Sequence, residues 1–205
     1  VDHDLRVDKV FRHVLGTEHR SDVEIFHEED NSFYYLRLAK SKCRGYITVT
    51  IANPTTTEVH FLRADRPRDD LKVVRPRRHR LSYYVVPCRD TFYIVTNEDA
   101  INFKVMEASA SDPSAKNWKE VLPHREDVVI DVSDPYPFVE PFRDHLVVFE
   151  REKAQGRIRV ISLKDRSSKL VRLPEKVFMA YPVENLDPDS AKLRIKYFSM
   201  VTPTT

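Results

Sequence analysis

Glycine is scarce in this chain, which has only 3 glycines among its 205 residues. A Gly-rich loop that cradles phosphates is therefore excluded. A nucleophile elbow carries glycines on both sides of its serine, and Gly16, Gly45 and Gly156 flank no serine in that pattern. With so few glycines, the hairpins are expected to turn through Asn, Asp and Ser.

Cysteine is also rare. The two cysteines, Cys43 and Cys88, are too few for a disulfide framework, so a reducing cytosol is expected and the location is predicted to be cytoplasmic. Each cysteine precedes a similar turn, which predicts two free thiols in matching hairpins. The eight histidines show no His-x-x-x-His spacing and form no zinc-like pair with a cysteine. The sequence therefore predicts no catalytic residue, no metal ligand and no cofactor site in this chain.

Long apolar runs and an excess of one charge are missing too. No segment approaches the roughly 18 apolar residues that a membrane helix needs, and the charged N-terminus lacks a signal-peptide core. The 34 Lys and Arg residues nearly balance the 32 Asp and Glu residues, so nothing draws the whole chain to nucleic acid or an anionic membrane. Helical periodicity is not sustained over ten residues, so helix is expected to be close to nil.

The sequence does contain a repeated pattern of short strands. A turn with an arginine leads into a strand three times, at Arg44, Arg89 and Arg143, which are 45 and 54 residues apart. A later strand ends in proline three times, at Pro76, Pro123 and Pro174, which are 47 and 51 residues apart. A period near 50 with four short strands is typical of β-propeller blades. A β-sandwich with evenly spaced strands is the alternative.

The predicted fold class is all-β, and residues 1–205 are expected to form a partial β-propeller of four-stranded antiparallel blades. About three blades are complete and two are partial. The divisions are the end of a blade at 1–30, complete blades at 31–76, 80–123 and 127–174, and the start of a blade at 176–200. The expected strands are 9–15, 23–27, 33–39, 46–52, 58–64, 71–75, 81–86, 92–96, 102–107, 118–122, 128–132 (with 138–142), 146–150, 158–163, 170–173, 177–183 and 193–198. Because Val1 is not an initiator methionine, the chain is expected to begin within a longer propeller.

Charged residues gather at the ends of the expected strands. The paired acids Glu28-Glu29, Glu98-Asp99 and Glu150-x-Glu152 are interpreted as solvated turn charges. One basic run is interpreted as a solvated linker between blades, because several aspartates lie just upstream and no aromatic ladder accompanies it. It consists of Arg75, Arg77, Arg78 and Arg80, with Lys72 and His79 nearby. The single tryptophan, Trp118, is expected to start an outer strand and to be largely buried.

A series of motifs runs in order along the chain. They are Arg12-His13-Val14-Leu15-Gly16-Thr17, Phe92-Tyr93-Ile94-Val95-Thr96-Asn97 with Ala100, Trp118-Lys119-Glu120, and Asp144-His145-Leu146-Val147 with Glu150-Arg151. Together they resemble the propeller of the prolyl oligopeptidase family. Further motifs resemble the oligopeptidase B branch: Asp4-Leu5-Arg6 with Lys9-Val10, Asn102-Phe103, Pro123-His124-Arg125, and residues 199–204. The chain departs from the family pattern at 153–156, in place of a tighter turn, and at 128–141, which carries extra prolines.

This resemblance implies a function for a longer parent protein. Family members join a seven-bladed propeller to an α/β-hydrolase domain with a Ser-Asp-His triad, and the propeller keeps folded proteins from the active site. Oligopeptidase B enzymes are cytoplasmic serine-type endopeptidases that cut short peptides after Arg or Lys. The chain would then be the C-terminal half of the propeller, with the catalytic domain of the same parent as its partner. No triad residue can be placed on this sequence, so the chain alone is expected to be inactive.

Two other functions stay open at this stage. The chain could be a free-standing propeller that serves as a protein-interaction module. A nucleic-acid binder built on the basic run is a third hypothesis, which the balanced net charge disfavours. For the half ring itself, the two partial blades are complementary, and self-association through their unpaired edges is favoured over closure into a four-bladed ring.

Overall fold

The computed structural model describes residues 6–133, 136–137 and 139–204. Asp4 and Leu5 of the opening motif and Phe138 of one expected strand lie outside the described residues. Nearly all regular structure in the described part is β, which confirms the predicted fold class. The helical elements there are two single turns of 3-10 helix, η1 (His19–Ser21) and η2 (Ala115–Asn117).

Three antiparallel sheets are complete blades, here called blades I, II and III. Blade I consists of β3 (Tyr35–Lys40), β4 (Tyr46–Ala52), β5 (Thr57–Arg63) and β6 (Lys72–Arg75). Blade II consists of β7 (Tyr83–Cys88), β8 (Thr91–Thr96), β9 (Lys104–Ser109) and β10 (Lys119–Leu122). In both blades the spatial order of the strands is their chain order, as expected for a propeller.

Blade III has a divided first strand. Its middle strands are β15 (His145–Glu152) and β16 (Gln155–Ser162), followed by the outer strand β17 (Ser168–Leu170). Two short strands pair with β15. β11 (Val128–Ile130) pairs with its C-terminal half, near Glu152, and β14 (Val139–Pro141) pairs with its N-terminal half, near Leu146. A small hairpin of β12 (Val132–Ser133) and β13 (Tyr136–Pro137) lies between them in the chain. The extra prolines of this region thus accompany a local insertion in the first strand.

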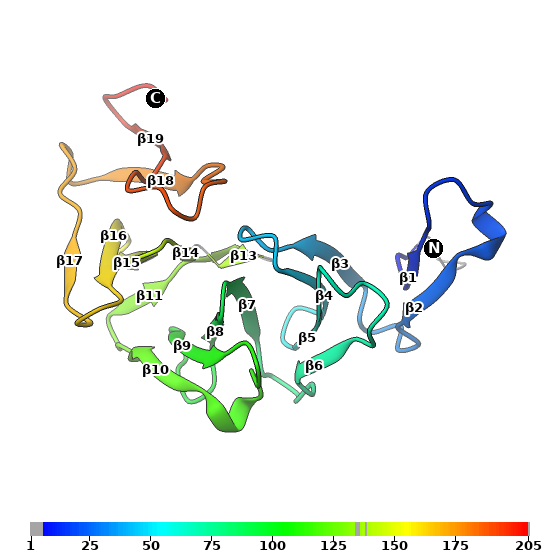
Figure 1. Ribbon diagram of the computed structural model, residues 1–205. Helices are drawn as coiled ribbons and strands as arrows, with labels where there is room; N and C mark the ends of the chain where they lie inside the picture. The colour runs from blue at the N-terminus through cyan, green and yellow to red at the C-terminus, as the bar shows by residue number, and fades with distance from the viewer. Residues whose placement is uncertain (1–5, 134–135, 138, 205) are drawn as a thin grey trace.

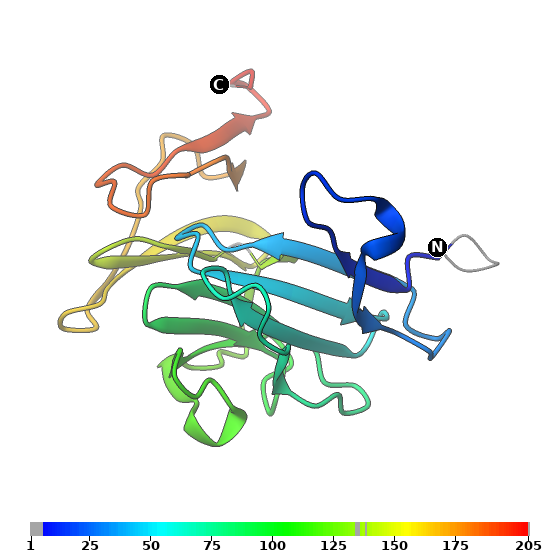
Figure 2. The same ribbon diagram turned by 45° about the vertical axis from the view of Figure 1, so that its right-hand side comes forward.

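Two hairpins stand at the ends of the arc (Figure 1). The N-terminal hairpin pairs β1 (Lys9–Arg12) with β2 (Val23–His27), and the C-terminal hairpin pairs β18 (Phe178–Pro182) with β19 (Ile195–Ser199). Each forms its own two-stranded sheet, and the two lie apart in both views (Figure 2). The described residues therefore form an open arc, and the closed four-bladed ring is not formed.

Alternate side chains of each middle strand face different neighbours. In β8, Phe92 and Ile94 pack in the cluster shared with blade I, whereas Tyr93 and Val95 pack in the cluster shared with blade III. This period of two is what places apolar residues on both faces of a blade. In β15 the same alternation divides its apolar residues between blade II and the C-terminal hairpin. The core is thus a series of layers between blades.

The hairpin turns agree with the sequence expectation in part. Asn53, Asp165 and Asp187 each accept a backbone N–H on the side-chain oxygen within their turns. Left-handed backbone (positive φ), however, occurs mostly at residues that are neither Gly nor Asn. These residues are Arg44, Arg80, Arg89, Phe103, Lys153, Ala154 and Arg166, with Asp99 as the one residue of an expected type. Lys153 and Ala154 form a two-residue turn, since Glu152 and Gln155 are paired in the β15–β16 ladder. Left-handed geometry costs an L-residue about 1–2 kcal/mol, which the long strand ladders outweigh.

Cys43 and Cys88 form a disulfide between blades I and II, with their Cα atoms 5.4 Å apart. The prediction of two free thiols was therefore wrong. Its premise was nevertheless sound, because both residues hold the same place in successive repeats, in the β3–β4 turn and at the end of β7. Equivalent places in adjacent blades lie side by side in space, so matching cysteines can reach each other.

Removing this disulfide should weaken the arc. The loop that it closes spans 45 residues, and the chain-entropy model gives a loss of about 4 kcal/mol for Cys43→Ser. We expect a lower denaturant midpoint for Cys43→Ser than for the wild type under oxidising conditions. With dithiothreitol the two proteins should converge. Two titratable thiols in the native oxidised protein would contradict the disulfide.

Candidate functional site

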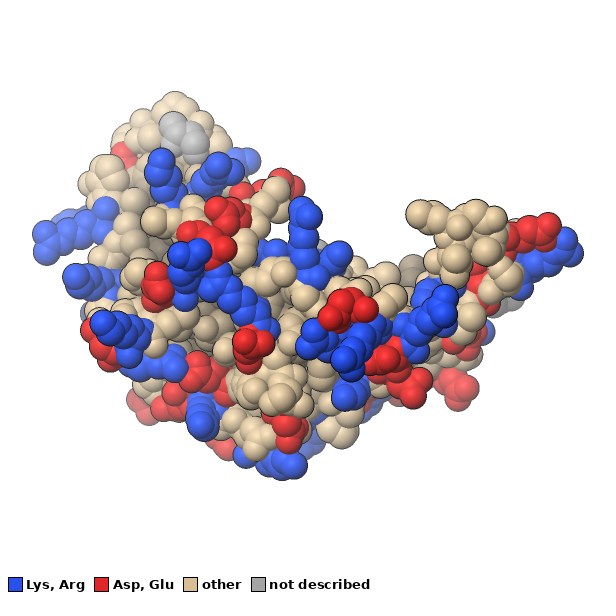
Figure 3. All heavy atoms as spheres, in the orientation of Figure 1, with Lys and Arg blue, Asp and Glu red and all other residues tan. Residues whose placement is uncertain are grey.

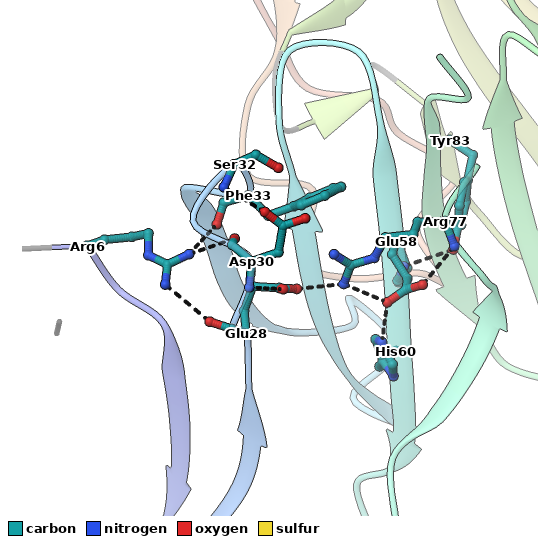
Figure 4. A network of polar contacts seen from close by, with 10 residues as sticks. Arg6, Glu28, Asp30, Ser32, Phe33, Glu58, His60, Arg77 and Tyr83 are labelled. Atoms are coloured by element: carbon teal, nitrogen blue, oxygen red, sulfur yellow. Dashed lines mark hydrogen bonds and ion pairs between the residues drawn. The ribbon is translucent and has the colours of Figure 1, made fainter. Parts of the chain in front are cut away.

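The two faces of the arc carry different connections. The turn face carries the hairpin turn from the first to the second strand of each blade, such as the turn at Arg44. The link face carries the turn from the second to the third strand and the segment that leads to the next blade, such as residues 76–82. The best-developed polar site lies on the link face and is centred on Arg77 (Figure 4).

Arg77 joins the N-terminal hairpin to blade I. Its Nη2 atom lies 2.5 Å from Glu28 Oε2, just after β2, and 3.1 Å from Glu58 Oε1 on β5. Its backbone N–H donates to the other oxygen of Glu58 at 2.7 Å. The guanidinium also lies 4.1 Å from the centre of the Phe33 ring. One guanidinium therefore pairs with two carboxylates, one from the N-terminal hairpin and one from blade I.

The environment of Glu58 keeps it charged. Its side chain is only 10% exposed, and burial alone would raise its pKa. His60 Nε2, at 3.0 Å, and Arg77 donate hydrogen bonds that outweigh burial and hold the pKa at about 2. The pKa of Arg77 is raised in turn, because both carboxylates more than offset its own burial. Glu58 and Arg77 are thus both ionised at neutral pH.

Tyr83 ties blade II to the same region. Its hydroxyl accepts a hydrogen bond from the Val59 backbone N–H at 2.9 Å and donates to the Arg75 carbonyl at 2.5 Å. Arg75 forms an ion pair with Glu98 of blade II, and that contact lowers the pKa of Glu98. The link between blades I and II is therefore held by both charged and neutral groups.

A third buried carboxylate lies in blade III. Glu150 is 0% exposed, and its oxygens accept hydrogen bonds from Arg125 at 2.6 Å and from Arg159 at 2.9 Å. Burial would raise the pKa of Glu150, but the two arginines outweigh burial and lower it. Arg125 belongs to the segment that leads from β10 to β11, so this contact fixes the entry to blade III.

These contacts correct two sequence interpretations. Glu28, Glu98 and Glu150 are not solvated turn charges, although Glu29 is exposed as expected. The basic run is not a solvated linker throughout, because Arg75, Arg77 and Arg78 pair with these acids. Each of these three glutamates lies at a strand end or turn in the sequence. Its arginine partner comes close only when the blades pack together. A glutamate among the apolar residues of β5 was the one available signal.

Charge over the surface is mixed as well. Basic and acidic side chains interleave over the face shown in Figure 3, which is hollowed between the N-terminal hairpin and the rest. With three arginines of the basic run committed to acids, a phosphate-binding stripe is poorly supported. The nucleic-acid hypothesis therefore loses the residues on which it depended.

The inner edge of the arc carries a further tie between blades. Lys42, beside the disulfide, lies 3.1 Å from Glu140 Oε2 and donates to the Pro141 carbonyl at 3.2 Å. Burial raises the pKa of Glu140, and Lys42 opposes that shift. This pair crosses from blade I to β14 of blade III, beside a cavity of about 180 Å³. The inner strands are thus held at a fixed spacing.

Trp118 is only partly buried, so the prediction of a largely buried indole was wrong in degree. It lies one residue ahead of β10, and its Nε1–H donates to the Pro113 carbonyl at 2.9 Å. Tyr83 and Arg75 lie beside the ring. Neighbouring blades diverge towards the rim, so they enclose an outer strand less completely than an inner strand.

Metal and membrane features were sought over the same part of the chain. Among residues 6–133, 136–137 and 139–204, no three His, Cys, Asp or Glu side chains are placed to hold a metal ion. In that part there is also no helix of the length and hydrophobicity that crossing a membrane requires.

Replacing Arg77 should test the link-face site. Arg77→Met leaves Glu28 and Glu58 without their shared cation, and an unpaired buried charge typically costs about 3–5 kcal/mol. Arg78→Met is the matched control, because Arg78 is largely exposed and should cost less than about 1 kcal/mol. Urea unfolding of both variants gives the comparison. Equal losses would show that Arg77 has no special role.

The pH dependence of stability gives a second test of this site. The folded pKa of Glu58 is depressed from 4.5 to about 2, so its stabilising effect is complete above pH 4.5 and is lost as the pH falls towards 2. By linkage the effect is about 3 kcal/mol. The stability difference between wild type and Glu58→Gln should therefore shrink between pH 6 and pH 3. A difference for Glu58→Gln that does not change with pH would contradict the assignment.

Comparison with known proteins relates this chain to a family and to individual peptidases. Residues 2–205 match the family model described as "Prolyl oligopeptidase, N-terminal beta-propeller domain". The chain is 32% identical over 198 residues to dipeptidyl aminopeptidase BI of Pseudoxanthomonas mexicana, covering 96% of this chain and 26% of that protein. It is 30% identical to protease 2 of Moraxella lacunata, covering 100% of this chain and 28% of that protein.

Solved structures agree with these matches. Oligopeptidase B from Leishmania major superposes with a TM-score of 0.87 at 27% identity, covering 99% of this chain and 29% of that one. Oligopeptidase B from Trypanosoma brucei, in a closed form with covalently bound antipain, gives 0.84 at 28% identity, covering 97% and 29%. The chain thus spans less than a third of the length of these relatives. It belongs to the prolyl oligopeptidase family, as part of the N-terminal β-propeller domain.

Proposed function

We propose that this chain is the substrate-gating propeller segment of an oligopeptidase B-like serine endopeptidase. The parent would hydrolyse short peptides after Arg or Lys, with the catalysis performed by an α/β-hydrolase domain of the same polypeptide. Support comes from the family match and from the similarity to two oligopeptidase B structures. Residues 1–205 would form one partial propeller domain of a seven-bladed ring, divided at 1–30, 31–76, 80–123, 127–174 and 176–200.

The ties between blades support a gating role, and they are the observation that carries the proposal. A propeller can exclude folded proteins only if its blades do not spread. Lys42–Glu140 holds the inner strands, and the ion pairs of Arg77 and Arg75 hold the link face. A ring built this way would admit extended peptides and refuse larger structures.

The topology also suggests which face meets the catalytic domain. A blade of four antiparallel strands begins and ends on the same side, so the chain enters and leaves each blade at the link face. A domain joined to the propeller by the same polypeptide would therefore contact the link face. The network around Arg77 lies next to this surface and would keep it rigid.

Location and assembly are parts of the same proposal. We place the parent in the cytosol, a reducing compartment, where reduction of the Cys43–Cys88 bond would leave two adjacent thiols and the ion pairs would still join the blades. For the isolated chain, self-association is expected because the C-terminal hairpin exposes apolar side chains. These are Val177, Met179, Met200 and Val201. Sedimentation of the isolated chain as a single monomeric species would argue against it.

Peptide hydrolysis tests the function. The continuous polypeptide that contains this propeller should cleave chromogenic peptides ending in Arg or Lys at least about tenfold faster than peptides ending in Pro, and a serine-directed reagent should abolish turnover. The isolated 205-residue chain should show none. A preference for Pro would overturn the substrate class, and inhibitor-sensitive turnover by the isolated chain would overturn the division of labour.

A further inference from the structure

Two arginines on the turn face converge on one carboxylate. Asp189, in the loop between β18 and β19, accepts a hydrogen bond on Oδ1 from Arg143 Nε at 3.0 Å and forms a second ion pair with Arg89 Nη2. Arg89 and Arg143 occupy the same turn in blades II and III. The repeat thus places two guanidinium groups side by side, and a residue far along the chain brings the anion to them.

The contact is open to water. The side chains of Arg89, Arg143 and Asp189 are 42%, 60% and 45% exposed. Exposed ion pairs are weak, because water and salt compete with them. Asp189 can therefore be displaced by another carboxylate, in contrast to Glu150 or Glu58 in their buried sites.

Hydrogen bonds that do not involve Asp189 hold together the two ends of the β18–β19 loop. Asn185 is buried there, and its side chain donates to the carbonyls of Val183 and Arg194 and accepts from the Arg194 N–H at 2.7 Å. These bonds close the loop without the arginines. The loop is therefore fixed at its base by Asn185, and Asp189 contacts Arg89 and Arg143 from its exposed end. A carboxylate on a separate molecule could make the same contact.

A cavity adjoins the two arginines. It has a volume of about 750 Å³ and lies between blades II and III, with Trp118 and Tyr93 in its lining. Cations outnumber anions there: Arg89, Lys116, Lys119, Arg143 and Arg166 against Asp90, Glu107 and Asp112. The volume is within the range of sites for small ligands. A peptide with its carboxylate on the arginines could lay its remaining residues along this cavity.

We propose that Arg89 and Arg143 form a binding site for a peptide carboxylate, and that Asp189 occupies the site as an internal competitor. Planar guanidinium groups match carboxylate geometry, which a single lysine would not do. The carboxylate can be the C-terminus of a peptide or an Asp or Glu side chain. The site lies on the turn face, away from the link face, so it does not require a catalytic domain.

Binding of labelled peptides tests this site in the chain as it stands. Fluorescence anisotropy would compare wild type with Asp189→Asn, using a fluorescein-labelled tetrapeptide with a free C-terminal carboxylate and one Asp. Asp189→Asn should lower the Kd by about fivefold, the effect of removing a competitor worth about 1 kcal/mol. Glu184→Gln, from the same loop, is the control for charge alone and should leave the Kd near that of wild type.

Further arms identify the carboxylate and the arginines. An amidated C-terminus should abolish the gain if the terminal carboxylate binds, and Asp→Asn in the peptide should abolish it if the side chain binds. Adding Arg89→Met and Arg143→Met to Asp189→Asn should also remove the gain, with the fold checked by circular dichroism. An unchanged Kd for Asp189→Asn, or a gain that survives loss of both arginines or of both peptide carboxylates, would overturn the proposal.

Discussion

A single blade cannot bury its own faces, and this constraint governs the whole structure. The middle strands β4, β8 and β15 carry apolar side chains on both sides, so each blade needs a neighbour on either side. Every core cluster is consequently shared between adjacent sheets. The arc is held together by these layers, and its two outer hairpins are each covered on one side only.

Charge follows the same geometry. Strand ends of one blade meet strand ends of the next, so an acid in one turn faces an arginine from the adjoining sheet. Arg77 with Glu28 and Glu58, and Arg125 with Glu150, are buried versions of this contact. Asp189 with Arg89 and Arg143 is the exposed version. The depth of burial separates contacts that fix the scaffold from one that a ligand can replace.

The sequence predicted the fold well because strand patterning and a period near 50 are visible along the chain, without knowledge of which residues are in contact. The expected strands at 46–52 and 23–27 agree with β4 and β2 at both ends, and most others differ by one to three residues. Contacts between blades were not predictable in the same way. The Cys43–Cys88 disulfide and the partners of Arg75 and Arg77 join positions that a repeat aligns but does not show to be adjacent. Turn chemistry also failed where Arg44 and Ala154 adopt left-handed backbone without being Gly or Asn.

The divided first strand of blade III has a consequence for how this domain can change in length. β11 pairs with β15 at Glu150–Glu152 and β14 pairs with it at Leu146–Val148, so each half of β15 has its own partner. Residues added between β11 and β14 would leave the β15–β16 register untouched, because neither half needs to slide. Evolution can therefore lengthen or shorten this insertion without repacking the core. The inner rim of blade III is a natural position for acquiring new loops.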